Sequence, residues 1–135
     1  MDISGELLDE LIAHVREDPG NEVCGVVAVE PGPPVRALRV HRATNVHASP
    51  LKFEIEPKEL LGLYNEIERN GGELGAIYHS HVRSAPYPSQ TDVNFAANWP
   101  GVEWIIVGLA GGGEPEVRSY LIEGGEVREL PLQVS

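Results

Sequence analysis

The sequence has little cysteine and few basic residues. Among its 135 residues there is one cysteine, Cys24, which excludes an internal disulfide framework and any multi-cysteine zinc or iron–sulfur site within one chain. Lys and Arg together number 10 against 21 Asp and Glu, so the net charge is −11 with neutral histidines. A charge of that sign disfavours non-specific binding to nucleic acid and to anionic membrane surfaces. We therefore expect neither nucleic acid nor a membrane among the partners.

Long apolar runs are missing as well. No stretch approaches the roughly 20 apolar residues that a membrane-spanning helix needs. The first residues, Met1 to Ser4, do not have the basic and then apolar pattern of a signal peptide. A length of 135 residues is typical of one domain. We predict a single cytoplasmic domain over residues 1–135.

The hydrophobic pattern predicts a mixed α/β domain with one main sheet, because strands outnumber helices and the helices lie at separated points. Helices are expected at 3–16, 57–70 and 91–98. Strands are expected at 23–29, 35–42, 51–56, 74–78, 102–109, 116–122 and 126–130.

Two histidines stand two positions apart at the end of a predicted strand. Residues i and i+2 of a strand point to the same face, so His79 and His81 are expected to project together, in line with Gly75 and Ile77. Neutral imidazoles held side by side are good zinc ligands. The alternative is that the two histidines only cap the strand or pack in the core.

Ser89 and Asp92 precede a predicted short helix. Their Ser-x-x-Asp spacing is that of a capping box, which is a sufficient structural explanation for both residues. The functional alternative makes Asp92 a third metal ligand, with water in the fourth position of a catalytic zinc. Ser89, about one helical turn earlier, is then expected near that water.

The whole pattern, His-x-His-x7-Ser-x2-Asp between His79 and Asp92, resembles the zinc-binding signature of the JAMM (MPN+) metallopeptidases. Residues 21–26 match a second segment of that family, and residues 45–57 resemble a third. Within that family, the sequence most resembles the small prokaryotic members, including the Mec-type peptidases, which act on a sulfur-carrier protein bearing a C-terminal cysteine. The resemblance implies a single MPN/JAMM-like domain with a central, mostly antiparallel, curved sheet flanked by helices.

The resemblance also implies a role for each site residue. His79, His81 and Asp92 would bind one Zn²⁺ per chain, and the metal would activate a water. Glu22 would act as general base and then general acid, and Ser89 would donate a hydrogen bond to the oxyanion. Because 57 positions separate Glu22 from His79, spacing alone does not bring Glu22 to the site. Without the resemblance, Glu22 reads as an exposed charge at the start of a strand.

The implied reaction is hydrolysis of an amide or isopeptide bond at the C-terminal tail of a small ubiquitin-like or sulfur-carrier protein that ends in Gly-Gly. Release of cysteine from a carrier–cysteine conjugate is one example. We expect the tail to add to a sheet edge at residues 51–56 or to lie along the 82–88 loop, where Arg83 would meet a carboxylate. A homodimer is compatible with the sequence.

Three alternatives stay open. Cys24 with His79 or His81 would make a thiol hydrolase, although free cysteine is more often buried packing. A non-catalytic MPN-like scaffold would have a vestigial site, and a metal-dependent hydrolase would act on small amides instead of a protein tail. A zinc nucleobase deaminase is excluded because its Pro-Cys-x-x-Cys element needs two cysteines.

Overall fold

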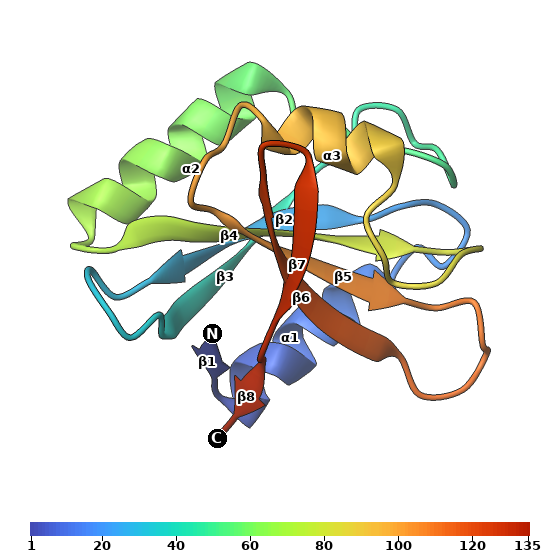
Figure 1. Ribbon diagram of the computed structural model, residues 1–135, viewed down its shortest axis with the longest axis horizontal. Coiled ribbons are helices and arrows are strands. Elements are labelled where there is room, and N and C mark those ends of the chain that lie inside the picture. Colours follow the sequence, from blue (N-terminus) through green and yellow to red (C-terminus); the bar gives the residue numbers. More distant parts are fainter.

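The computed structural model describes residues 1–135 and contains three helices and eight strands (Figure 1). The helices are α1 (Gly5–Val15), α2 (Pro57–Arg69) and α3 (Gln90–Ala96). The strands are β1 (Asp2–Ile3), β2 (Cys24–Val29), β3 (Ala37–Ala43), β4 (Glu73–His81), β5 (Glu103–Gly108), β6 (Glu116–Glu123), β7 (Glu126–Leu130) and β8 (Gln133–Val134).

Six of the strands form one sheet in the order β3-β2-β4-β5-β6-β7, which confirms the mixed α/β class and the mostly antiparallel sheet. Within this sheet, only the neighbours β4 and β5 run parallel to each other. Parallel neighbours need a crossover connection, and here the crossover is residues 82–102, which include α3. The crossover therefore carries Asp92 back over the end of the strand that bears the two histidines.

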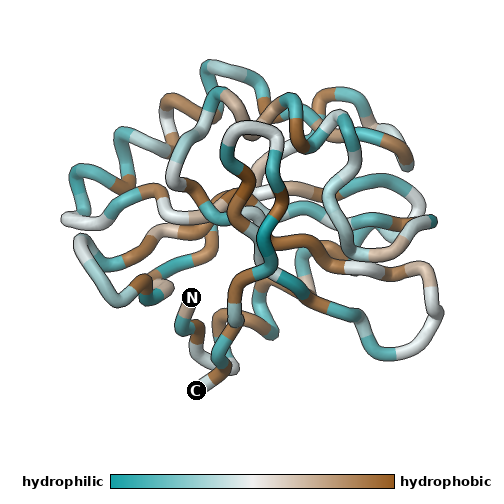
Figure 2. Tube along the Cα trace, in the orientation of Figure 1, coloured by the Kyte–Doolittle hydropathy of each residue, from teal (hydrophilic) through white to brown (hydrophobic).

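Helices cover both faces of the sheet, with α2 and α3 on one face and α1 on the other (Figure 1). Alternation along β4 divides the core accordingly, since Ile77 packs in the cluster that includes Leu60 of α2 and Ala96 of α3, whereas Tyr78 packs with Leu11 of α1. Figure 2 shows hydrophobic residues along the strands in the middle and hydrophilic residues on many of the outer turns. His79 and His81 share the parity of Ile77, so they face the side of α2 and α3.

The predicted strand at 51–56 is wrong. Within it only Ile55 forms a bridge, to Asn45, and the bridge is isolated. The alternating pattern is present, but no neighbouring strand pairs with the segment. Its backbone groups instead bind the side chain of Asn45, which donates to the carbonyl of Lys52 and accepts from the N–H of Glu54. The segment therefore does not form the regular strand edge that we expected for a substrate tail.

Two smaller differences concern the first residues and the histidines. The first helix begins at Gly5 instead of residue 3 because Ser4 caps it, and Ile3 belongs to β1. This strand pairs in parallel with β8, a contact that the sequence pattern did not predict. The strand expected at 74–78 extends through His81, so both histidines lie within β4.

No helix of the structure has the length and apolarity needed to cross a membrane.

Candidate active site

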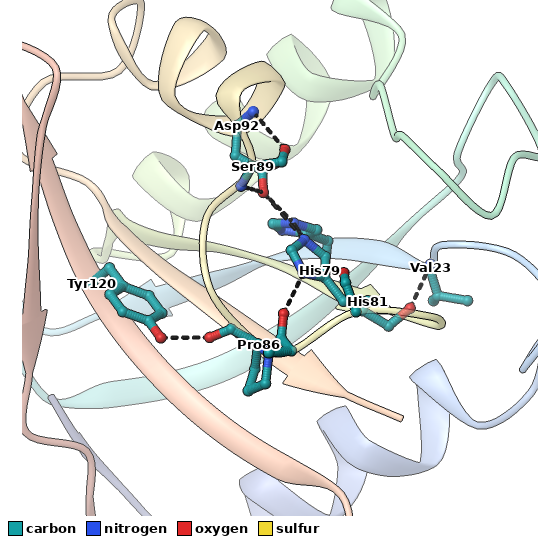
Figure 3. Close-up of polar contacts among 10 residues, drawn as sticks. Val23, His79, His81, Pro86, Ser89, Asp92 and Tyr120 are labelled. Carbon is teal, nitrogen blue, oxygen red and sulfur yellow. Dashed lines mark hydrogen bonds and ion pairs between the residues drawn. The ribbon is translucent and has the colours of Figure 1, made fainter. Parts of the chain in front are cut away.

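Three donor atoms converge at the C-terminal end of β4 (Figure 3). The Nε2 atoms of His79 and His81 lie 3.1 Å apart, and Oδ2 of Asp92 lies 3.1 Å from the first and 3.2 Å from the second. All three residues are buried, with exposed fractions of 0% for His79, 4% for His81 and 4% for Asp92. Two strand residues and one helix residue therefore form a nearly equilateral triangle of two nitrogens and one oxygen.

This triangle fits a zinc ion. Ligand atoms about 2.0–2.1 Å from a tetrahedral zinc lie roughly 3.3 Å from one another. The three separations of 3.1, 3.1 and 3.2 Å are close to that value. Two imidazoles and one carboxylate are also a common protein ligand set for catalytic zinc, which keeps its fourth position open.

Asp92 takes part in two structures: the N-terminal cap of α3 and the triangle of metal-ligand atoms from His79, His81 and Asp92, called the donor triangle below. Its N–H donates to Oγ of Ser89 at 3.1 Å, and the N–H of Ser89 donates to Oδ2 of Asp92 at 3.0 Å, which completes the capping box of α3. Burial works to raise the pKa of Asp92, but the two histidines and the Ser89 N–H outweigh it and hold the pKa well below its usual range. Asp92 is thus a fixed, charged carboxylate. Ser89 itself is exposed, and its hydroxyl hydrogen is still available for donation.

His81 is oriented by the loop that follows it. Its Nδ1 lies 2.9 Å from the carbonyl oxygen of Ala85, so Nδ1 carries the proton and Nε2 keeps its lone pair for a ligand. The hydroxyl of Tyr120 donates to the carbonyl of Pro86, the next residue of the loop (Figure 3). Burial lowers the pKa of His81, but the bonds with Asp92 and Ala85 outweigh this effect and leave the pKa raised.

His79 lies deeper than His81. Its ring stacks on Phe53, with centroids 4.4 Å apart and an interplanar angle of 26°. Complete burial is the largest effect on its pKa and lowers it, so the neutral form that binds metal is favoured. Its Nδ1 has no hydrogen-bond partner in the protein.

Glu22 reaches the same place from the other end of the chain. One of its carboxylate oxygens lies within 4.8 Å of ligand nitrogens of His79 and His81, and the residue is only 5% exposed. Its Oε1 is buried without a partner. Burial raises the pKa of this carboxyl to about 7; His81 opposes the rise and Asp92 adds to it. Glu22 is not the exposed charge that its local sequence alone suggests, because the sheet register brings the start of β2 beside the end of β4.

Neither Cys24 nor Arg83 belongs to the triangle formed by His79, His81 and Asp92. Cys24 is fully buried in β2, opposite His79, and burial raises the pKa of its thiol to about 12, with Glu59 and Glu22 adding to the rise. A thiol that stays protonated at neutral pH is a poor nucleophile, so the structure disfavours the thiol hydrolase. Arg83 is exposed on the loop after β4.

Sequence reasoning missed two residues that hold the site together. Ser80 lies between the histidines and points to the opposite face, where its hydroxyl accepts from the N–H of Val23 at 2.9 Å, beside Glu22. The signal for Ser80 was a polar residue inside an otherwise apolar strand. Asn45 binds the carbonyl of Glu22. Its only signal was the resemblance of residues 45–57 to a family segment.

Residues 4–123 match the family described as prokaryotic homologs of the JAB domain. The chain belongs to this JAB-domain family. Among its curated relatives, the CysO-cysteine peptidase of Mycobacterium tuberculosis is 34% identical over 132 residues, covering 98% of this chain and 89% of the relative. The desampylase of Haloferax volcanii is 32% identical over 139 residues, covering 99% and 96%. Membership of the family confirms the resemblance to JAMM peptidases.

The JAB-domain fold is also found among solved structures. The JAB1/MPN domain protein AF2198 of Archaeoglobus fulgidus superposes with a TM-score of 0.65 at 19% identity, covering 99% of this chain and 98% of that one. At that identity the similarity concerns the fold alone, and it confirms the expected MPN/JAMM-like architecture.

Proposed function

We propose that this chain is a zinc-dependent peptidase that hydrolyses an amide or isopeptide bond at the C-terminal tail of a small ubiquitin-like or sulfur-carrier protein. The observation that carries the proposal is the triangle of His79, His81 and Asp92 beside a buried carboxylate, that of Glu22, with an unpartnered oxygen. The names of the two relatives, CysO-cysteine peptidase and desampylase, support a conjugate as the substrate.

His79, His81 and Asp92 would hold one zinc ion. Bound zinc lowers the pKa of a water towards about 7 and polarises a carbonyl oxygen. The histidines are presented through Nε2, His81 because Ala85 takes its Nδ1 proton. Asp92 is presented through Oδ2, which the Ser89 N–H orients.

Glu22 is the proposed general base and acid. A carboxyl with a pKa of about 7 is able to take a proton at neutral pH and to return it to the leaving amine. One of its oxygens lies within 4.8 Å of ligand nitrogens of both histidines, which is close enough to reach a water bound beside them. Ser89 is the proposed oxyanion donor, because its oxygen already accepts from Asp92 N–H and its hydrogen is left to donate.

The burial of the site supports a glycine-rich tail. The three residues His79, His81 and Asp92 are at most 4% exposed, so a scissile bond has to come close to the protein surface around them. Glycine allows this approach because it has no Cβ. We propose a tail that ends in Gly-Gly, and Arg83 as the contact for a carboxylate on the leaving group.

The test uses a purified carrier ending in Gly-Gly, joined either to cysteine or to a lysine of a second protein. We expect zinc-loaded enzyme to cleave the conjugate, chelation to stop cleavage, and zinc to restore it. The matched substrate carries Ala-Ala in place of Gly-Gly and is expected to react far more slowly. Equal rates on both tails would instead indicate a hydrolase of small amides. No zinc and no turnover would indicate the non-catalytic scaffold.

A further inference from the structure

We infer that Asn45 is the positioning residue for Glu22, an inference that rests on the proposed role of Glu22 as general base. Asn45 follows β3 and begins a loop, residues 45–54, that leads to α2. The side chain is half-buried, and it touches neither the donor triangle nor the carboxylate of Glu22 in any recorded hydrogen bond. Its action on the site would therefore pass through the backbone.

The side chain of Asn45 uses its full hydrogen-bonding capacity. Its Nδ2 donates to the carbonyl oxygens of Glu22 and Lys52, both at 3.0 Å. Its Oδ1 accepts from the N–H groups of His47 and Glu54, both at 3.1 Å. An asparagine side chain has two N–H donors and two acceptor lone pairs, so the four bonds fix its orientation. The amide thus joins both arms of the loop to Glu22.

The loop also holds the other backbone group of Glu22. The N–H of Glu22 donates to the carbonyl oxygen of Ser49 at 2.8 Å. Glu22 stands two residues before β2, where the sheet hydrogen bonds have ended. Both of its backbone polar groups are therefore bound by the 45–54 loop and not by a neighbouring strand of the sheet.

The shape of the loop is specific. Ala48 has a φ of +44°, in the left-handed region that residues with a side chain rarely adopt. Its N–H donates to the backbone carbonyl of Asn45 at 3.3 Å, and the next residue is Ser49. A backbone conformation of this kind persists where surrounding contacts determine it. The same turn that strains Ala48 presents the Ser49 carbonyl to Glu22.

The carboxylate of Glu22 is not held by hydrogen bonds within the protein. Its Oε1 is buried without a partner, so the hydrogen bonds that position the base are those of its backbone. Displacement of a catalytic group by about 1 Å can cost about 100-fold in rate. We therefore expect loss of the hydrogen bond from Asn45 to the Glu22 carbonyl to lower the catalytic rate and to leave metal binding unchanged.

The experiment is the substitution Asn45→Asp. Aspartate has the same shape and keeps the acceptor for His47 and Glu54, but it replaces the donor to the carbonyls of Glu22 and Lys52 with an oxygen. We expect kcat on the conjugate to fall about 10- to 100-fold, with KM and zinc content unchanged, because the donor triangle is untouched. The matched control is Asn70→Asp, since Nδ2 of Asn70 donates to the carbonyl of Glu66 at 2.9 Å far from the site. Its kcat should equal that of the wild type.

A double-mutant cycle separates positioning from a general structural effect. If Asn45 acts through Glu22, N45D lowers the residual rate of Glu22→Gln much less than it lowers that of the wild type. Additive losses, or an N45D enzyme as fast as the wild type, would overturn the inference. Should N45D not fold, Asn45→Ser replaces it in the cycle.

Amide hydrogen exchange provides a readout without activity. In N45D the amides of His47 and Glu54 should stay protected. The Glu22 amide donates to the Ser49 carbonyl and not to Asn45, and it should exchange faster because the Glu22 backbone is no longer held at its carbonyl. Unchanged exchange at Glu22 would count against the inference. A wild-type enzyme that cleaves no conjugate would refute the proposed function instead, and the two failures are therefore distinguishable.

Discussion

His79 and His81 present Nε2 atoms 3.1 Å apart to a single oxygen of Asp92. The pair comes from adjacent same-face positions of β4, and the oxygen comes from the first turn of α3. Because a crossover links these elements, the triangle depends on the whole β4–α3–β5 unit.

Asp92→Asn should remove zinc. The amide keeps the size of the carboxylate but loses its charge, so we expect zinc affinity to fall by more than about 100-fold, since even outer-shell partners are worth 10- to 100-fold. The measurement is zinc content after dialysis against a weak chelator. Ser89→Ala is the matched control, because it loses the capping hydroxyl, at about 1 kcal/mol, but keeps the ligand set. An Asp92→Asn protein that retains one zinc would contradict the assignment.

Gly108→Ala should disturb His81 from a distance. A Cβ on Gly108 would lie 2.8 Å from Cδ of Pro86, so the 82–88 loop has to shift and the Ala85 carbonyl with it. We expect zinc affinity to fall roughly 10-fold, measured by competition with a chromogenic chelator. Gly111→Ala serves as control because a Cβ there meets nothing within 4 Å. Equal affinities for the two variants would show that the loop does not orient His81.

Glu22→Gln should stabilise the metal-free protein in a pH-dependent way. Burial raises the folded-state pKa of Glu22 from 4.5 to about 7, so the wild type gains stability from this group at low pH and loses it as pH rises towards 7. Glutamine stays neutral. The advantage of the variant is therefore expected to be small at pH 5 and to approach about 3 kcal/mol at pH 8.

The measurement is urea unfolding of both proteins at the two pH values with chelator present. Glu30→Gln, at an exposed position, reports the effect of removing a surface charge. A stability difference that is the same at pH 5 and pH 8 would mean that Glu22 is already ionised without cost in the folded protein.

Cys24 should be inert in the native state. With a pKa of about 12, only about one thiol in 10,000 is ionised at pH 8, and the residue is fully buried. A thiol-reactive chromogenic disulfide should therefore label it only after unfolding. Cys24→Ala should keep the cleavage rate of the wild type within about twofold. Rapid native labelling together with loss of activity in the variant would revive the thiol hydrolase.

Much of this architecture follows from local pattern. Alternation placed His79 and His81 on one face because side chains alternate along any strand. The Ser89–Asp92 spacing predicted the capping box because the first turn of a helix leaves N–H groups that need acceptors. The expected helices and all but one of the expected strands are present, with ends shifted by a few residues.

The pattern failed at residues 51–56 because a strand needs a partner as well as alternation. Lys52 and Glu54 instead direct their backbone groups to Asn45. The local sequence of neither segment predicts these hydrogen bonds. The amide of Asn45 reaches Lys52 and Glu54 only when the loop between them is folded.

The sequence by itself determined the face on which the histidines lie, because the alternation of side chains along a strand is a property of neighbouring residues. It did not bring Asp92 to the histidines, since that contact needs the crossover through α3. Only the tertiary structure decided that Glu22 stands within 4.8 Å of them. The antiparallel register of β2 with β4 sets Cys24 opposite His79 and brings a residue 57 positions away to the same edge. That register results from packing of the whole sheet, and a local pattern does not specify it.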